Sequence, residues 1–155
     1  MKLELLADDP DAYKTVAKWY FDKWVCLIPG VTIDRLENKL SKAINRNSAP
    51  LLVLAKDRDE LVGAAELKLH EMDIFPEYEY WLGGVYVKDT SRGNGIGKAL
   101  TLDVKERAKS AGVKRLYLQT ESLDGGLYRS CGFEDIDEVD YKGYRVLVMV
   151  AEIYA

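Results

Sequence analysis

The chain has 155 residues, the size expected for one domain. Its hydrophobic content of 48% and charged content of 31% are ordinary for a globular chain and exclude intrinsic disorder. The 22 basic residues against 26 acidic ones give a formal charge of −4. This balance argues against nucleic acid as the main partner, because phosphate neutralisation requires a basic face.

Targeting and metal-binding signals are also missing from the sequence. No run approaches the roughly 18 apolar residues that a membrane span requires, and the first residues lack the apolar core of a secretory signal. We therefore expect no membrane association and a cytoplasmic location. Two cysteines, Cys26 and Cys131, and one histidine, His70, are too few for a disulfide framework or for a zinc site, so no metal is predicted.

The first half of the chain predicts a strand, two helices and a hairpin. Residues 2–6 alternate weakly as a strand would. Asp9-Pro10 is typical of a helix start, and apolar residues follow at helical spacing as far as Trp24, before Pro29-Gly30. Thr32 is placed to cap a second helix with one apolar face, formed by Ile33, Leu36, Leu40 and Ile44. Residues 51–55 and 61–69 are apolar runs around a charged turn, which indicates an antiparallel hairpin.

The second half predicts strands around one long helix. Residues 78–87 form an aromatic and β-branched strand, and residues 96–111 form an amphipathic helix that ends at Gly112. A strand over 113–120, a short helix or turn over 123–131 and an antiparallel pair over 133–140 and 144–153 complete the chain. The fold class is α/β (α+β), a mixed sheet with helices packed on it.

A glycine-rich loop joins the strand at 78–87 to the long helix. Gly93, Gly95 and Gly97 leave several backbone N–H groups unshielded at a helix N-terminus, which is suited to binding an anion. The loop is not a Walker A loop, because Arg92 replaces the first glycine and Ala99 replaces the Ser/Thr. It also departs from the dinucleotide fingerprint in its spacing. The alternative is a glycine-rich turn that binds no ligand.

The segment Arg92-Gly93-Asn94-Gly95-Ile96-Gly97 resembles the R/Q-x-x-G-x-G/A signature of the GNAT superfamily, the acetyl-CoA-dependent N-acetyltransferases. Downstream, Leu127-Tyr128-Arg129-Ser130-Cys131-Gly132-Phe133 is similar to the L-Y-x-x-x-G-F segment of that family. The resemblance implies a single N-acetyltransferase domain over residues 1–155. It also implies a mostly antiparallel sheet of about seven strands, splayed at its centre, with helices on both faces.

The resemblance further implies where acetyl-CoA binds, with coenzyme A as product. The pantetheine arm would enter the gap between strands 78–87 and 113–120, and Gly83-Gly84 fits a β-bulge that opens this gap. The loop amides would hold the pyrophosphate, and Lys98 could add a charge. The cofactor-binding residues predicted in this way are Val85, Tyr86, Val87, Arg92, Gly93, Asn94, Gly95, Ile96, Gly97, Lys98 and Thr120. The family's usual asparagine at the end of the second strand is absent, and Thr120 or Gln119 would substitute.

Two proton transfers accompany acetylation of an amine. The resemblance places Tyr128 beside the coenzyme sulfur, where a tyrosine that stays protonated can act as general acid. The family often uses a carboxylate before the glycine loop as base, and we take Glu79 as the candidate. Glu66 on the preceding strand is the alternative, and His70 could also be the base, although a lone histidine at a strand end is more often structural. Each of these carboxylates can instead be a solvated surface group.

The predicted function is acetyl transfer from acetyl-CoA to a primary amine of a small molecule or peptide. Glu71, Asp73 and Glu77 make the nearby loop acidic, which favours a cationic amine. The strands over 133–153 carry enough apolar surface for a homodimer, or simply to close the sheet. Two other functions are compatible with the sequence: a catalytically idle acyl-CoA sensor, and an interaction domain whose glycine loop is only a turn.

Overall fold

A computed structural model describes residues 1–153 of the chain. The predicted order of elements is confirmed. The strands are β1 (Lys2–Leu5), β2 (Leu51–Asp57), β3 (Glu60–Leu69), β4 (Tyr80–Val87), β5 (Arg115–Thr120), β6 (Glu134–Tyr141) and β7 (Tyr144–Glu152). The α-helices are α1 (Tyr13–Tyr20), α2 (Ile33–Ser41) and α3 (Ile96–Ser110). None of the described helices is long and apolar enough to cross a bilayer.

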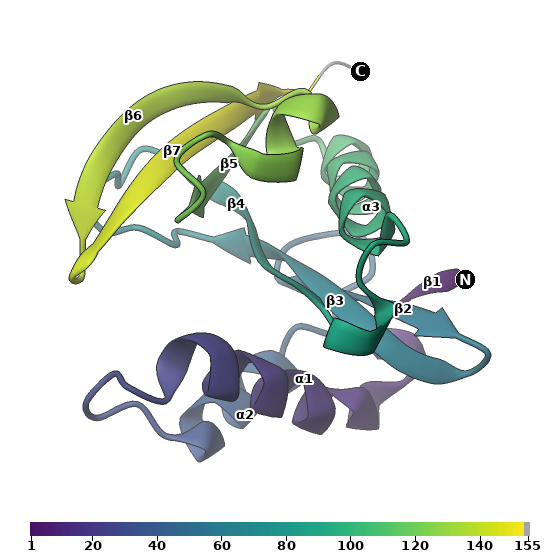
Figure 1. The fold of residues 1–155 in the computed structure, drawn as a ribbon. Helices are drawn as coiled ribbons and strands as arrows, with labels where there is room; N and C mark the ends of the chain where they lie inside the picture. Colours follow the sequence, from purple (N-terminus) through teal and green to yellow (C-terminus); the bar gives the residue numbers. More distant parts are fainter. Residues whose placement is uncertain (154–155) are drawn as a thin grey trace.

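The strands form one sheet of seven in the order β1-β2-β3-β4-β5-β7-β6, which confirms the expected mixed sheet. All neighbours are antiparallel except β4 and β5. These two strands run parallel and share a single aligned residue pair, Trp81 and Tyr117. Figure 1 shows the strands of the C-terminal half turning away from β1–β4. The expected splay at the centre of the sheet is therefore present.

A β-bulge follows Trp81, the residue at which β4 is aligned with β5. Along β3 the register advances from Ala64 to Glu66, while along β4 it advances from Tyr86 to Gly83, so β4 carries the extra residue. Gly84 has a φ of +57°, which a residue with a Cβ adopts only at a cost. The bulge predicted at Gly83-Gly84 is confirmed.

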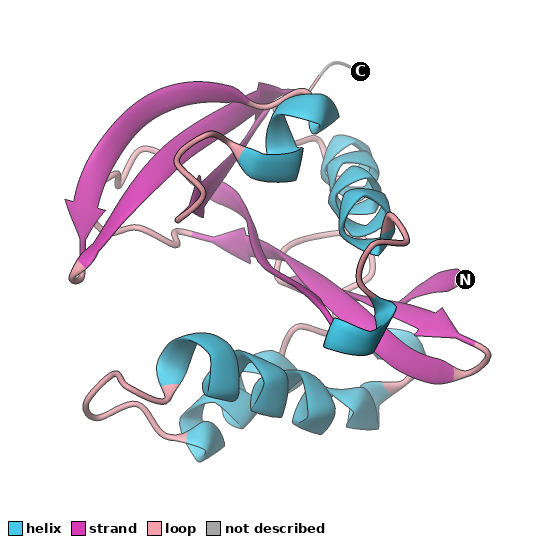
Figure 2. Cartoon of the chain, in the orientation of Figure 1, coloured by secondary structure: helices cyan, strands magenta, loops and turns pink. Residues whose placement is uncertain are grey.

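The helices cover both faces of the sheet (Figure 2). On one face, α1 and α2 pack on a buried cluster that includes Leu52, Leu54 and Ala64. On the other face, α3 packs through Leu100, Val104 and Ala108. Successive side chains of a strand point to opposite faces, which explains why the buried run of β2 contributes to both clusters.

The N-terminal helices differ in detail from the sequence prediction. Residues Pro10–Ala12 form a 3₁₀ turn, so the α-helix begins at Tyr13 rather than directly after Asp9. Residues Phe21–Val25 then form a π-helical turn. Thr32 caps α2 as expected, because its Oγ1 accepts a hydrogen bond from the N–H of Arg35 at 3.2 Å. Ile44, predicted on the apolar face of α2, lies beyond the end of that helix and is exposed.

The C-terminal part forms a 3₁₀ helix and a long hairpin. The short helix or turn expected over 123–131 is a 3₁₀ helix, Gly126–Cys131. The hairpin β6–β7 turns at Lys142-Gly143 as predicted. β7 pairs on both sides, whereas β6 is an edge strand whose residues are mostly exposed and largely acidic. Charged edge strands resist pairing with another chain.

Two leucines of α3 test this packing. Leu100 is fully buried against the sheet, whereas Leu102 on the same helix is 41% exposed. We expect Leu100→Ala to lower the free energy of unfolding by about 2–5 kcal/mol, because it leaves a cavity between α3 and the sheet. Leu102→Ala is the matched control, with an expected loss of about 0.5 kcal/mol or less. Urea titration measures both, and equal losses would contradict the assignment of this face as core.

Candidate functional site

A cavity of about 370 Å³ lies where β4, the glycine loop and the 3₁₀ helix meet. Its apolar wall comes from Val85 and Val87 of β4 and from Leu127. The remaining lining residues are Lys23, Arg92, Gly93, Gly95, Ile96, Gly97, Lys98 and Tyr128. The cavity therefore brings together the two sequence motifs, which are separated by α3 and β5 along the chain.

The floor of the cavity at the start of α3 is built from free backbone amides. Within the described residues, the N–H groups of residues 93–98 donate no hydrogen bond to a protein oxygen. Gly95 precedes the helix with a φ of +75°, and no side chain caps the helix. Because a helix N-terminus also carries partial positive charge, these amides form a site for an anionic group. The N–H groups of residues 96–98 are unpaired as in the first turn of any helix, and those of residues 93–95 extend this set into the loop.

Polar side chains hold the loop in shape. The Arg92 guanidinium contacts the Asp89 carboxylate at 3.0 Å and donates to the carbonyl of Val87 at 3.2 Å. The side-chain amide of Asn94 donates to the carbonyl of Ser91 at 3.0 Å. Lys98 is exposed in the first turn of α3. Arg92 and Lys98 therefore add positive charge to the rim, whereas Asn94 supports the backbone without lining the cavity.

Tyr128, on the 3₁₀ helix, lines the same cavity. Its ring packs edge-on against Phe133, with the ring centroids 6.2 Å apart. Burial, followed by the nearby Cys131 and Glu71, raises the pKa of Tyr128 to about 12. The phenol is therefore protonated at neutral pH and available as a hydrogen-bond donor.

A buried carboxylate lies beside the β4 bulge. Glu66 is only 6% exposed on β3, and it faces Gly83 in the strand register. A Cβ at Gly84 would lie 2.7 Å from Oε2 of Glu66 and 2.5 Å from the hydroxyl of Tyr20, so glycine is required there. Burial raises the pKa of Glu66, and the positive charges of Lys68 and Lys39 only partly oppose this effect.

Two neighbours fix the surroundings of Glu66. The Tyr20 hydroxyl donates to the carbonyl of Gly84 at 2.5 Å. The Lys68 ammonium contacts the Glu71 carboxylate at 2.8 Å. Burial disfavours the charge of Lys68, but the attraction of Glu71 and Glu66 outweighs it and raises the pKa of Lys68. The charge of Glu71 raises the pKa of both Glu66 and Tyr128. These two carboxylates are therefore close enough to the cavity to act on it electrostatically.

Several predicted site residues lie elsewhere. Glu79 was expected within the strand, but β4 begins at Tyr80, and Glu79 is exposed in the preceding connection and does not line the cavity. The ring of Tyr86 points to the α1 side, where it stacks on Trp19. The Thr120 hydroxyl accepts a hydrogen bond from the N–H of Ser122 at 3.1 Å and does not line the cavity.

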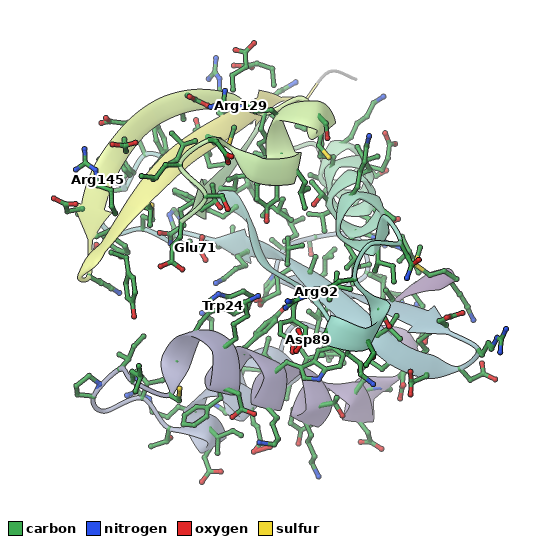
Figure 3. The ribbon with its side chains drawn as sticks, viewed as in Figure 1. Trp24, Glu71, Asp89, Arg92, Arg129 and Arg145 are labelled. Carbon is green, nitrogen blue, oxygen red and sulfur yellow. The ribbon has the colours of Figure 1, made fainter. Side chains whose placement is uncertain are left out.

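The structure adds one cavity residue that the sequence did not indicate, Lys23 of the π-helical turn. In Figure 3, the neighbouring Trp24 lies above the end of the first helix and Arg92 lies across from it on the connection between β4 and α3. No group of three or more His, Cys, Asp or Glu residues within 1–153 is arranged to hold a metal ion.

Comparisons with known proteins agree with this geometry. The profile of the acetyltransferase (GNAT) family matches residues 8–133. The chain is 32% identical over 114 residues to aminoglycoside N(6')-acetyltransferase type 1 from Stenotrophomonas maltophilia, which covers 70% of this chain and 74% of that protein.

Solved structures show the same fold. A crystal structure of aminoglycoside 6'-acetyltransferase type Ii has a TM-score of 0.74 and 20% identity, with 100% of this chain and 99% of the other covered. A ribosomal-protein-alanine N-acetyltransferase from Brucella melitensis gives a TM-score of 0.74 at 20% identity, covering 98% and 99%. An aminoglycoside 6'-N-acetyltransferase complexed with coenzyme A gives 0.74 at 16% identity, covering 100% and 98%.

Proposed function

Because the chain belongs to the acetyltransferase (GNAT) family and is an acetyl-CoA-dependent N-acetyltransferase, we propose that it acetylates a primary amine of a small cationic molecule by direct transfer. The observation that carries the proposal is the set of free amides over residues 93–98 in a cavity that Val85, Val87 and Tyr128 also line. Acetyl-CoA supplies an activated thioester carbonyl, and the protein's own residues bind it, orient it and move the protons.

The chemistry of the cavity fits the donor. Unpaired amides and the charges of Arg92 and Lys98 suit a pyrophosphate, and hydrogen bonds to charged groups contribute roughly 1.5–3 kcal/mol each. Val85 and Val87 present an apolar strand surface, and β4 is aligned with β5 at only one residue pair. The backbone of β4 beyond that pair is therefore placed to bind the amides of an extended arm, as another strand would.

Substitution of Gly95 tests the amide site. We expect Gly95→Val to raise the dissociation constant for coenzyme A at least tenfold, about 1.4 kcal/mol, because valine does not readily adopt the φ of +75° and the loop amides therefore shift. Gly112→Val is the matched control: both glycines have positive φ, +75° and +83°, and open space around the Cβ position, but Gly112 follows α3 far from its start. Calorimetric titration of both variants measures the difference, and unchanged affinity for Gly95→Val would contradict the assignment.

We assign the proton acceptor to Glu66 rather than Glu79. An alkylammonium group with a pKa near 10.4 must lose a proton before its nitrogen can attack a carbonyl. Glu66 is buried beside the bulge, and its raised pKa lies closer to the working pH, which makes a more effective base. Neither Glu66 nor Glu79 lines the cavity, but Glu79 is exposed in the connection before β4, where packing does not fix its carboxylate.

The pH dependence of activity distinguishes the two carboxylates. Glu66 acts only when ionised, so activity falls as the pH drops through its raised pKa, and the acidic limb lies above the ordinary glutamate value of about 4.3. We expect Glu66→Gln to lower kcat sharply and abolish this limb, while Glu79→Gln keeps it. A profile of kcat against pH measures both variants. Loss of the limb only in Glu79→Gln would reassign the base to Glu79.

Tyr128 is proposed as the group that stabilises the departing thiolate. Its pKa of about 12 keeps the phenol protonated, and the thiol it serves has an ordinary pKa near 8.5. Complete proton transfer is therefore uphill, so the main effect is a hydrogen bond that strengthens as negative charge develops on sulfur. The thiolate finally takes its proton from solvent, and Tyr128 keeps its own.

Removal of one hydroxyl tests this role. We expect Tyr128→Phe to reduce kcat by roughly 10²–10⁴, with little change in coenzyme affinity, because the ring and its contact with Phe133 are retained. Tyr144→Phe, at an exposed position on β7, is the control and should leave kcat unchanged. A thiol-release assay measures turnover, and an unaltered rate in Tyr128→Phe would reduce Tyr128 to a packing role.

The identity of the acceptor is tested with a panel of amines. The aminoglycoside acetyltransferase relative and the acidic β3–β4 connection support a cationic small molecule. Thiol release should therefore be fastest with aminoglycosides or polyamines and slower with neutral amines. Tight binding of coenzyme A without turnover on any amine would favour the sensor alternative. The homodimer and the cytoplasmic location stay predictions.

A further inference from the structure

We propose that Lys23, on the π-helical turn that follows α1, binds the pyrophosphate of the acetyl donor from the side opposite the glycine loop. The proposal rests on the function proposed above and adds a binding residue outside both sequence motifs. Its support is geometric: Lys23 lines the same cavity as the loop amides, yet it comes from the helical layer on the other side of β4.

The π-helical turn places Lys23 at the cavity. The N–H of Cys26 donates to the carbonyl of Phe21 at 2.7 Å, a span one residue longer than that of an α-helix. The wider turn lets both Trp19 and Trp24 reach the ring of Tyr86, at centroid distances of 4.9 and 6.2 Å. Lys23 is carried by the same turn, so its side chain is directed toward β4.

Aromatic rings hold the ammonium group of Lys23 in place. Its Nζ lies 5.4 Å from the ring centroid of Trp24 and 5.5 Å from that of Tyr86. Such contacts orient a cation without neutralising it, since the rings carry no net charge. The three N–H donors of the ammonium group remain available to a ligand.

Lys23 has no carboxylate partner among residues 1–153, whereas Arg92 and Lys18 each have one. Arg92 is paired with Asp89 at 3.0 Å, and Lys18 of α1 is paired with Asp22 at 2.9 Å. Lys23 is exposed; partial desolvation, followed by the positive charge of Arg92, lowers its pKa, whereas the carboxylates of Asp89 and Glu121 oppose this shift. An anion between Lys23 and Arg92 would relieve their repulsion.

The cations and free amides around the cavity favour the pyrophosphate of acetyl-CoA over a carboxylate as the bound anion. Free amides over residues 93–98 and the side chains of Arg92 and Lys98 approach the cavity from the loop. Lys23 adds a charge from across the cavity, so a pyrophosphate would be held from two sides. A carboxylate carries a single charge and would leave most of these donors unused.

Binding measurements on Lys23→Met test the proposal, because methionine keeps an unbranched side chain over the two rings and removes only the charge. We expect the dissociation constants for coenzyme A and for 3'-dephospho-coenzyme A to rise by the same factor, about tenfold, in calorimetric titrations. Lys23→Arg should restore most of the affinity for both ligands. Lys18→Met, on the preceding helix α1, is the matched control and should bind both ligands as the unmodified protein does.

Three results of these titrations would contradict the proposal or the function on which it rests. Unchanged affinity of Lys23→Met for both ligands would overturn the proposal, provided that its thermal midpoint matches that of the unmodified protein. A loss for coenzyme A but not for the dephospho form would also overturn it, because Lys23 would then contact the 3'-phosphate. Failure of the unmodified protein to bind coenzyme A would refute the proposed function itself, which separates the two claims.

Discussion

The separation of β4 from β5 is the constraint on which the site depends. In a regular sheet the backbone groups of β4 would be satisfied by its neighbour, and no strand-like ligand could bind there. Here a single aligned pair, Trp81 and Tyr117, joins the two strands. On the other side of β4, where it pairs with β3, lie the bulge at Gly84 and the buried carboxylate of Glu66. One interruption of the ladder thus creates both a groove for the donor and a buried position for a base.

The two ends of the site obtain their properties from opposite physical effects. At the glycine loop, donors are left unpaired and exposed, so an anion gains hydrogen bonds that the protein does not make itself. At Tyr128 and Glu66, burial raises both pKa values and so favours the protonated forms. Because Tyr128 is far from ionising while Glu66 titrates nearer to neutrality, the same effect gives one group a donor role and the other an acceptor role.

Much of the fold and part of the site could be predicted from the sequence. The bulge and the long helix follow from local pattern, because Gly83-Gly84 interrupts a strand and apolar residues recur at helical spacing after Gly95. The placement of Glu79 does not, because the sequence pattern does not fix where a strand begins and Glu79 lies one residue before β4. Lys23 could not be found either: a π-helical turn differs from an α-helix by one residue, and only contacts distant in sequence select it.

The close packing of α3 on Gly63 limits how far this helix can move when a ligand binds. A methyl group at this position would lie 2.8 Å from the carbonyl oxygen of Tyr86 and 3.2 Å from Leu100, so the helix already sits at its closest approach to the sheet. The first turn of α3 is packed on β3 in the same way, because the added methyl group would also lie 3.4 Å from Ile96. Association needs little rearrangement on this side, and the entropy lost on complex formation falls mainly on the flexible donor rather than on the polypeptide.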